Sequence, residues 1–271
     1  MGIIASLGQR TISNLDGFGD FCRFCGRTFG WALEGTARWR NLRLLFPQLY
    51  HVGTRSVPVV MITGAFVGMV LAVQMVAQFK AVGMVARMGT IVNLSVLREL
   101  GPVLTGVLLA GRIGGGLAAE LGTMRVTEQI DALRAMGADP IRVLVVPRFL
   151  ACVLLIPVLV MYADFMGIMG GYVVSVWVYG LSGADFWRQA ARTVEYFDIF
   201  YGPIKSVSFG MAISLVCCYK GFNCSAGAAG VGRACTEGFV ASTMAVLALD
   251  FFLGMFMNTA YEFVYGLKSL L

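Results

Sequence analysis

The chain has 271 residues, of which 58 % are hydrophobic and only 13 % are charged. Globular proteins usually carry about 25 % charged residues, so this composition excludes an ordinary water-soluble domain and favours a protein of the lipid bilayer. We attribute the net charge of +6 to membrane topology and not to nucleic-acid binding, because no basic cluster is interleaved with aromatic side chains that could stack on bases.

Residues 1–50 form the first predicted region, an amphipathic segment at the membrane surface. Its stretch "FGDFCRFCGRTFGWALEGTARWRNLRLLF" mixes aromatic residues with arginines and has no charge-free run, which is typical of a helix lying in the headgroup layer. Cys22 and Cys25 have the spacing of a metal-binding pair, but no second pair follows and His51 is the only histidine. We therefore expect cysteines that pack in apolar surroundings, and no metal site.

Residues 51–271 form the second predicted region, an all-α, polytopic membrane domain with about five transmembrane helices. A helix needs about 20 apolar residues to cross the hydrocarbon core. Five stretches meet this requirement: Val57 to Phe79, Gly101 to Leu121, Phe149 to Tyr179, Pro203 to Phe222 and Phe239 to Ala260. The third is too long for one perpendicular span, so we expect it to tilt or to project beyond the membrane.

The distribution of lysine and arginine predicts the orientation of these spans. With the N-terminus inside, the inner segments hold thirteen basic residues and the outer segments hold six. Cytoplasmic segments carry an excess of lysine and arginine. We therefore expect the N-terminus inside and the C-terminus outside.

The stretch "RVTEQIDALRAMGADP" between the second and third spans predicts a short, water-exposed helix over residues 125–138. Thr127 can cap its start, and Gly137 can end it in a left-handed conformation. One face carries three apolar residues at helical spacing: Val126, Ile130 and Leu133. Because so short a helix is not stable alone in water, this face packs either on its own membrane domain or in a groove of a partner protein.

A second surface helix is expected over residues 183–199, between the third and fourth spans. Its apolar residues recur at helical spacing, at Phe186, Ala190, Val194 and Phe197. The predicted orientation puts this helix on the outer side.

Three pairs of glycines have the spacing that lets membrane helices approach closely. The pairs are Gly64 and Gly68, Gly111 and Gly115, and Gly167 and Gly171. They indicate helix packing inside one subunit or, alternatively, the seam of a dimer.

Ionisable residues near the outer ends of two spans point to a polar site. Glu99 and Lys205 lie at similar depth, so we expect them to pair, which leaves Arg98 free to meet a lipid phosphate. The alternative is that these side chains snorkel to the headgroups and have no role in transport.

Arg112, Asp164 and Asp250 lie within spans and are predicted to be buried structural charges, with Arg112 and Asp250 as a candidate pair. A proton relay through the same residues is the alternative. On the first span, Leu71, Met75, Gln78 and Phe79 lie in the outer half, and their largely apolar surface suits an acyl chain. From spacing alone they could equally face lipid or pack inside the protein.

The central segment "RELGPVLTGVLLAGRIGGGLAAELGTMRVTEQIDALRAMGADPIRVLVVPR", residues 98–148, resembles the MlaE/YrbE family of permeases in lipid-transporting ABC systems. The resemblance continues through "IKSVSFGMAISLVCCYKGF" and "GAAGVGRACTEGFVASTMAVLALDFF" and covers the chain from about Tyr50 onward. More distantly, "IDALRAMGADP" is similar to the EAA loop of ABC importers.

This resemblance implies a homodimeric permease of a bacterial inner membrane that moves phospholipid and maintains outer-membrane lipid asymmetry. It implies a cytoplasmic ABC ATPase at the coupling helix, residues 125–138, and a periplasmic partner with an MCE domain. Contacts to the ATPase would come from Glu128, Asp131 and Arg134 (charged) and from Ile130 and Leu133 (apolar). The resemblance also puts seven residues on the substrate path: Leu71, Met75, Gln78, Phe79, Arg98, Glu99 and Lys205.

The chain contains no G-x-x-x-x-G-K-[ST] sequence that could hold nucleotide phosphates. We therefore expect a non-catalytic subunit without cofactors, with ATP and magnesium on the partner ATPase. Two other classes stay open. A proton-coupled transporter of lipids or small amphiphiles would need no ATPase, and a lipid enzyme would need an acid and base converging at headgroup depth.

Overall fold

The computed structural model describes residues 3–35, 39–82 and 88–265, and every regular element among them is helical. Five of these helical stretches are long and apolar enough to cross a membrane: Leu44–Ala81, Met88–Val126, Ile141–Val178, Tyr196–Phe222 and Ala228–Tyr261. The predicted all-α, polytopic membrane fold is therefore confirmed.

The spans are built from consecutive α-helices joined by π-helical turns. The first comprises α2 (Trp39–Leu49), η1 (Tyr50–Thr54) and α3 (Val57–Val82), and the second comprises α4 (Met88–Ser95), η3 (Val96–Leu100), α5 (Gly101–Leu109), η4 (Ala110–Gly114) and α6 (Gly115–Val126). The third comprises η5 (Ile141–Val145), α8 (Val146–Val173) and η6 (Val174–Val178), and the last two are α10 (Tyr196–Phe222) and α11 (Ala228–Tyr265).

The second span begins at Met88 and not near Gly101 as predicted. Arg98 and Glu99 lower the hydropathy of the segment, but the helix continues through them because Glu99 pairs with Lys205 of α10. Both residues therefore lie inside the span, about 15 Å along the helix from its first residue.

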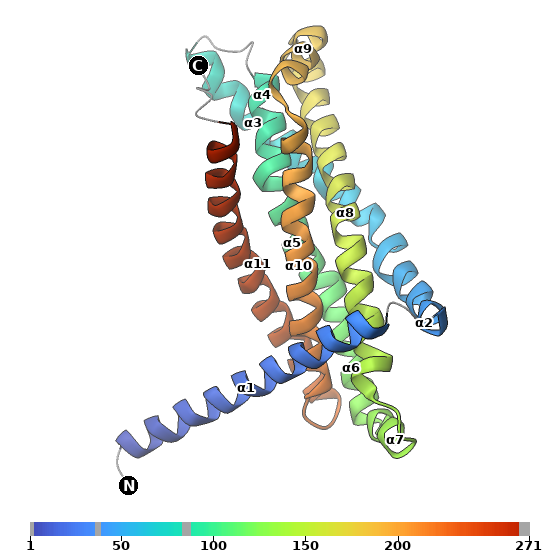
Figure 1. Cartoon of the computed structure of the whole chain (residues 1–271). Coiled ribbons are helices and arrows are strands. Elements are labelled where there is room, and N and C mark those ends of the chain that lie inside the picture. The colour runs from blue at the N-terminus through green and yellow to red at the C-terminus, as the bar shows by residue number, and fades with distance from the viewer. Residues whose placement is uncertain (1–2, 36–38, 83–87, 266–271) are drawn as a thin grey trace.

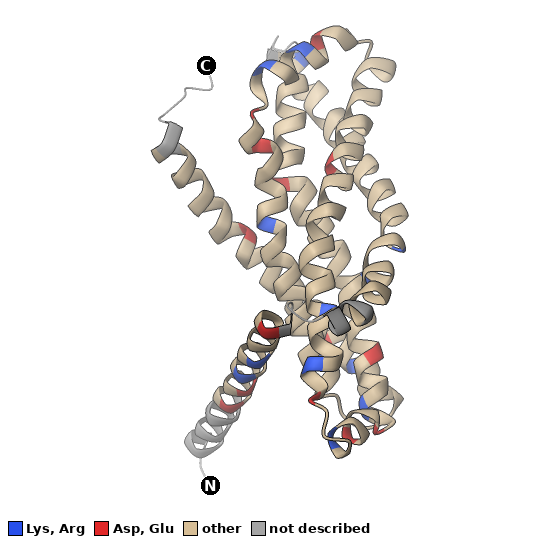
Figure 2. Cartoon of the chain, turned by 45° about the vertical axis from the view of Figure 1, so that its right-hand side comes forward, with Lys and Arg blue, Asp and Glu red and all other residues tan. Residues whose placement is uncertain are grey.

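The bundle has two distinct ends (Figure 1). The short helix α7 (Gln129–Ala135) projects from one end, and α1 (Ile3–Gly35) lies across the bundle near it. The helix α9 (Gly183–Thr193) and the last turns of α11 lie at the opposite end. Charged residues gather on α1 and near both ends, with a few inside the bundle (Figure 2).

Close backbone contact joins α3 to α8. A side chain on Gly68 would collide with the carbonyl oxygen of Gly167, and one on Gly64 would collide with that of Ala163. These glycines therefore serve packing inside one subunit, the first of the two predicted roles. Gly111 faces the ring of Phe239, whereas a methyl group on Gly115 would meet open space.

The helix at the projecting end is shorter than the predicted segment 125–138. Residues up to Val126 continue α6, and the chain then turns sharply because Glu128 has a left-handed φ of 59°. Thr127 does not cap α7, since its hydroxyl donates to the carbonyl of Thr123. The predicted end is confirmed, with φ of 75° at Gly137.

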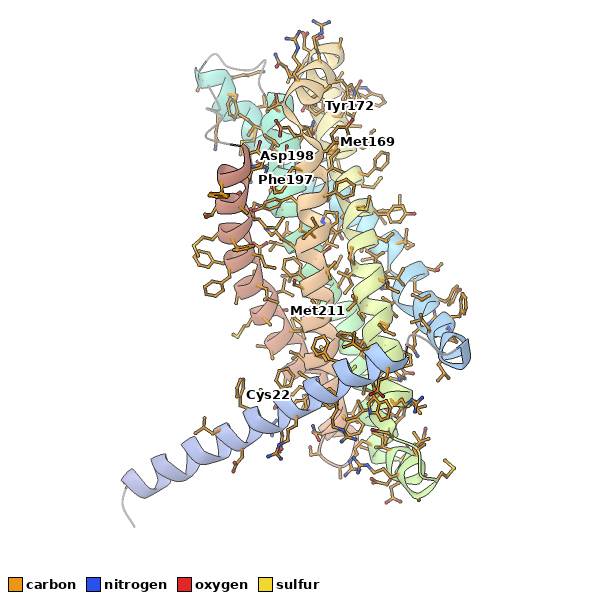
Figure 3. The ribbon with its side chains drawn as sticks, in the orientation of Figure 1. Cys22, Met169, Tyr172, Phe197, Asp198 and Met211 are labelled. Carbon is orange, nitrogen blue, oxygen red and sulfur yellow. The ribbon has the colours of Figure 1, made fainter. Side chains whose placement is uncertain are left out.

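The surface helix at the other end is also shorter than residues 183–199. It stops at Thr193 because Glu195 and Asp198 form a capping box that starts α10, so Phe197 belongs to α10. Phe186 and Ala190 are buried as the spacing predicted. Tyr172 of α8, labelled in Figure 3, packs its ring against Phe186 and Trp187.

The helix α1 is fastened to the loop that follows α7. The carboxylate of Asp139 accepts hydrogen bonds from Arg27 (2.8 Å), Trp31 (2.8 Å) and the backbone N–H of Ile141 (3.0 Å). Burial raises the pKa of Asp139, but these donors outweigh it and hold the pKa below its ordinary value. We call this contact the Asp139 clasp.

Candidate functional site

A buried ionic cluster joins the second, fourth and fifth spans. The Lys205 side chain is fully buried, and its Nζ lies 3.0 Å from Glu99 Oε2 and 2.7 Å from Asp250 Oδ1. The α10 backbone can approach η3 closely here because Gly202, one turn before Lys205, has no side chain to collide with the carbonyl of Leu97. The predicted Glu99–Lys205 pair is therefore present in the structure.

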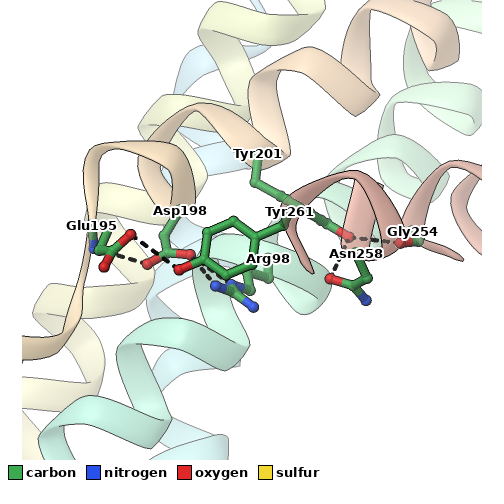
Figure 4. Close-up of polar contacts among 7 residues, drawn as sticks. All are labelled: Arg98, Glu195, Asp198, Tyr201, Gly254, Asn258 and Tyr261. Carbon is green, nitrogen blue, oxygen red and sulfur yellow. Dashed lines mark hydrogen bonds and ion pairs between the residues drawn. The ribbon is translucent and has the colours of Figure 1, made fainter. Parts of the chain in front are cut away.

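Arg98 is not free to meet a phosphate, contrary to the prediction. Its Nε donates to Asp198 Oδ1 at 2.7 Å, and its guanidinium lies 5.8 Å and 5.6 Å from the ring centres of Tyr201 and Tyr261 (Figure 4). Asp198 was missed by the sequence analysis. The spacing of Glu195 and Asp198, a capping-box pattern just before an apolar run, could have identified it.

Tyr201 extends the cluster toward α11. Its hydroxyl donates to the carbonyl of Gly254 at 3.1 Å and lies 3.4 Å from Asn258 Oδ1 (Figure 4). The phenol of Tyr261 donates in turn to Glu195 at 3.1 Å. Since charged groups are costly at membrane depth unless they are paired, these contacts explain how the ionic cluster is held within the bundle.

Asp250 pairs with Lys205, so the predicted Arg112–Asp250 pair is wrong. Arg112 lies 13 positions beyond Glu99 on the same span, toward the α7 end, and this separation keeps it from the level of Asp250. Its Nε donates to Ser56 Oγ at 3.3 Å and its Nη2 to the carbonyl of Arg55. Arg112 is exposed in this structure, not buried as predicted.

Asp164 is buried as predicted, with 3 % of its surface exposed. It fills the space left by Gly101 and Gly202, and its Oδ1 has no hydrogen-bond partner among the described residues. The ion pairs between described residues include none with Asp164. Its role as a structural or a titrating group stays a prediction.

The predicted acyl-chain residues of the first span divide into two groups. Leu71 is buried in a cluster with Val76, Val92 and Val96, and Met75 packs against this cluster. Leu71 therefore supports the wall of the bundle and does not line an open surface. Gln78 is exposed and Phe79 half-buried.

Two of the predicted ATPase contacts differ in exposure. Ile130 is fully buried in the chain's own core, together with Leu121 and Phe222, so it anchors α7 and is not available to a partner. Helical spacing identified its apolar face but could not tell which neighbour covers it. Leu133 is half-buried, and Met136, just after the helix, is 73 % exposed.

The charged residues of α7 remain at the surface. Glu128 is exposed, and Asp131 accepts from Arg125 at 2.7 Å and from Arg134 at 3.1 Å. These ion pairs fix the orientation of a small polar surface at the projecting end of the bundle.

An integral membrane protein with five spans, a polar cluster between them and an exposed helix at one end has the architecture of a membrane permease. A family profile described as Permease MlaE matches residues 45–256. The chain belongs to the MlaE permease family and is a non-catalytic membrane subunit of the ABC transporter type.

Relatives from several organisms match along nearly the whole chain. The Haemophilus influenzae intermembrane phospholipid transport system permease protein MlaE is 36 % identical over 95 % of this chain and 98 % of its own length. A probable ABC transporter permease protein of Rickettsia felis is 38 % identical over 93 % of this chain and 96 % of its own length. The chloroplast protein TRIGALACTOSYLDIACYLGLYCEROL 1 of Arabidopsis thaliana is 39 % identical over 83 % of this chain and 63 % of its own length.

Proposed function

We propose that the chain is the permease of an ABC transporter that moves phospholipid between a bacterial inner membrane and a periplasmic MCE-domain partner. The similarity to the Haemophilus influenzae protein, which spans almost the full length of both chains, carries this proposal. Within this proposal, maintenance of outer-membrane lipid asymmetry is the narrowest claim, because the similar proteins also include a chloroplast protein.

In this proposal the α7 end is cytoplasmic and the α9 end is periplasmic. An ABC ATPase, which carries the ATP and magnesium, docks on α7 through Glu128, Asp131, Leu133 and Arg134. Two copies of the chain form a homodimer. The exposed apolar side chains of α11, among them Phe251, Phe252 and Phe256, offer a surface for the second copy.

The proposed mechanism is mechanical. Binding of ATP draws two ATPases together, and α7 moves with them because they are docked on it. The movement reaches the bundle because Ile130 fixes α7 to the core. The motion narrows the space between the two copies near the ionic cluster and expels the lipid. Arg98, Glu99, Lys205, Gln78 and Phe79 lie at the levels where the lipid would pass.

The test of the docking helix is co-purification of the permease with an ABC ATPase co-expressed with it. We expect Leu133→Asp and Met136→Asp to reduce the bound ATPase at least tenfold, since each puts a charge into an apolar contact. Tyr196→Asp is the matched control, because Tyr196 is 86 % exposed at the opposite end. Unchanged ATPase binding in both α7 variants would refute docking on α7.

A proton-coupled transporter is the second candidate, and the observation that favours it is Asp164. This buried carboxyl group has an unpartnered oxygen within the described structure, as a proton-carrying residue would. Transport that continues without ATPase but stops when a pH gradient is removed would support this candidate.

A further inference from the structure

A second polar site lies between the first and second spans, apart from the ionic cluster. It is a pocket of about 270 Å³ formed where η1 faces η4 and α6. This volume is close to the lower end of the range for small-molecule sites, about 300 Å³. Its polar groups include Arg55, Arg112 and His51, while Val52 and Leu117 provide apolar walls.

The pocket carries an excess of positive charge. No ion pair between described residues involves Arg55 or Arg112. Glu120 also lines the pocket, but its carboxylate is paired with Arg148 at 2.8 Å. Arg55 and Arg112 therefore line the same pocket, and the acidic residue beside them, Glu120, is already paired with Arg148.

The geometry of Arg112 is that of a fixed donor. Ser56 Oγ and the carbonyl of Arg55 hold its Nε and Nη2. Its Nη1 donates to no described residue, and the Arg55 side chain next to it is exposed. Arginine forks of this kind match the oxygens of a phosphate group and form charge-assisted hydrogen bonds with it.

The depth of the pocket indicates a ligand from the membrane. Arg112 lies eight positions before Glu120 on one helical span, so it is about 12 Å deeper from the α7 end. Arginine at such depth costs a few kcal/mol unless it meets an anion or water. A phospholipid headgroup drawn slightly below the membrane surface would provide that anion.

We propose that this pocket binds the phosphate group of a membrane lipid from the α7-side leaflet, with Arg55 and Arg112 as its anion-binding residues. The site does not depend on the transport of the bound lipid, so it holds even if the proposed function fails. It adds an entry or holding position that is separate from the ionic cluster.

The test uses the full-length protein in detergent, without ATPase, and a photoactivatable phosphatidylglycerol. Peptide mass spectrometry should find crosslinks within residues 48–56 or 112–120. Arg55→Gln should lower this crosslinking about tenfold, the effect of losing one charge-assisted hydrogen bond. Arg188→Gln, an exposed arginine on α9, should have no effect.

Each outcome decides the proposal. Unchanged crosslinking in a folded Arg55→Gln variant would overturn the proposal. Crosslinks of the wild-type protein found only in other segments would also overturn it, and that result does not depend on whether the variant folds. Millimolar inorganic phosphate added as competitor separates the two sources of phosphate. Lipid crosslinking that persists in the presence of phosphate supports a lipid ligand. Complete displacement of the lipid by phosphate assigns the site to a free anion and overturns the proposal of a lipid ligand.

Discussion

Lys205 neutralises the two carboxylates of the ionic cluster. It is fully buried between Glu99 and Asp250, so removal of its charge leaves two carboxylates facing each other. Loss of one partner of a buried ion pair typically costs about 3–5 kcal/mol. Stability therefore depends on Lys205, and in the proposed function lipid passage depends on it as well.

A charge exchange tests this balance. Lys205→Glu should abolish most lipid transport and lower the melting temperature, because three carboxylates then meet at one site. Adding Glu99→Lys should restore both in part, but not fully, since Asp250 stays next to the new carboxylate. The measurements are transport and thermal unfolding of the purified variants.

The control for this exchange is Lys205→Glu combined with Glu99→Gln. It removes a negative charge without adding a positive one, so it should recover less than the exchange does. Equal recovery by the two double variants would show that charge pairing is not what Lys205 supplies.

Sequence reasoning found part of this cluster for a physical reason. Glu99 and Lys205 could be paired because the hydropathy pattern puts them at similar depth on their spans, although both lie further inside those spans than predicted. Asp198 could have been found only from the capping-box pattern that marks the start of α10. Asp250 could not be placed, because its height depends on how α11 leans against α10. Arg112 was misassigned for the same reason.

Among the elements, α1 and α7 are linked through the Asp139 clasp. Arg27 and Trp31 of α1 donate to the same carboxylate that follows α7. The ring of Trp31 also lies 4.8 Å from the guanidinium of Arg142. In the proposed mechanism, movement of α7 would therefore reach α1 as well as the bundle.

The pH dependence of the clasp follows from the pKa of Asp139. Because the folded pKa lies below the ordinary value of about 3.9, the ionised form is favoured. The stabilisation is present above that ordinary value and is lost only as the pH falls through the lower folded value. Hydrogen exchange within residues 24–32, corrected for intrinsic rates, should thus show equal protection at pH 7 and pH 5.

Asp139→Asn should weaken the clasp at both pH values, because the amide accepts less strongly from Arg27. We expect a loss of about 1–2 kcal/mol in local opening. Asp20→Asn is the control, since Asp20 is exposed on the same helix. Protection that drops between pH 7 and pH 5 in the wild type would contradict the assigned direction of the pKa shift.

The contact between α3 and α8 gives a prediction about stability. Gly68→Ala should destabilise the protein by about 1–3 kcal/mol, because the new methyl group collides with the backbone of Gly167. Gly115→Ala makes the same chemical change in open space and should leave thermal unfolding unchanged or raise its midpoint. An equal loss in both variants would contradict close packing at Gly68.

The boundaries of the elements could be predicted less well from the sequence than the spans themselves. The five spans could be predicted because about 20 apolar residues leave few alternatives. The turn at Glu128 could not, because it depends on a left-handed residue. The break after Thr193 could be predicted only from the capping-box pattern of Glu195 and Asp198, which hydropathy does not report. The helical spacing of apolar residues also could not show that Ile130 packs on its own subunit.

At the scale of the whole molecule, the two ends of the bundle carry different elements. The five spans of the described residues put α1 and α7 at one end and the last turns of α11 at the other (Figure 1). The ionic cluster lies inside the bundle, between these ends. In the proposed function, an ATPase bound at the α7 end would therefore act at a distance on lipid near the ionic cluster.

The most direct test of this account is lipid transfer in proteoliposomes that contain the permease and its ABC ATPase. A fluorescent phospholipid is placed in the membrane, and its transfer to or from a soluble acceptor is followed. We predict transfer that requires ATP hydrolysis and that Leu133→Asp abolishes without unfolding the permease. Transfer by the permease alone, driven by a pH gradient and unaffected by Leu133→Asp, would contradict it.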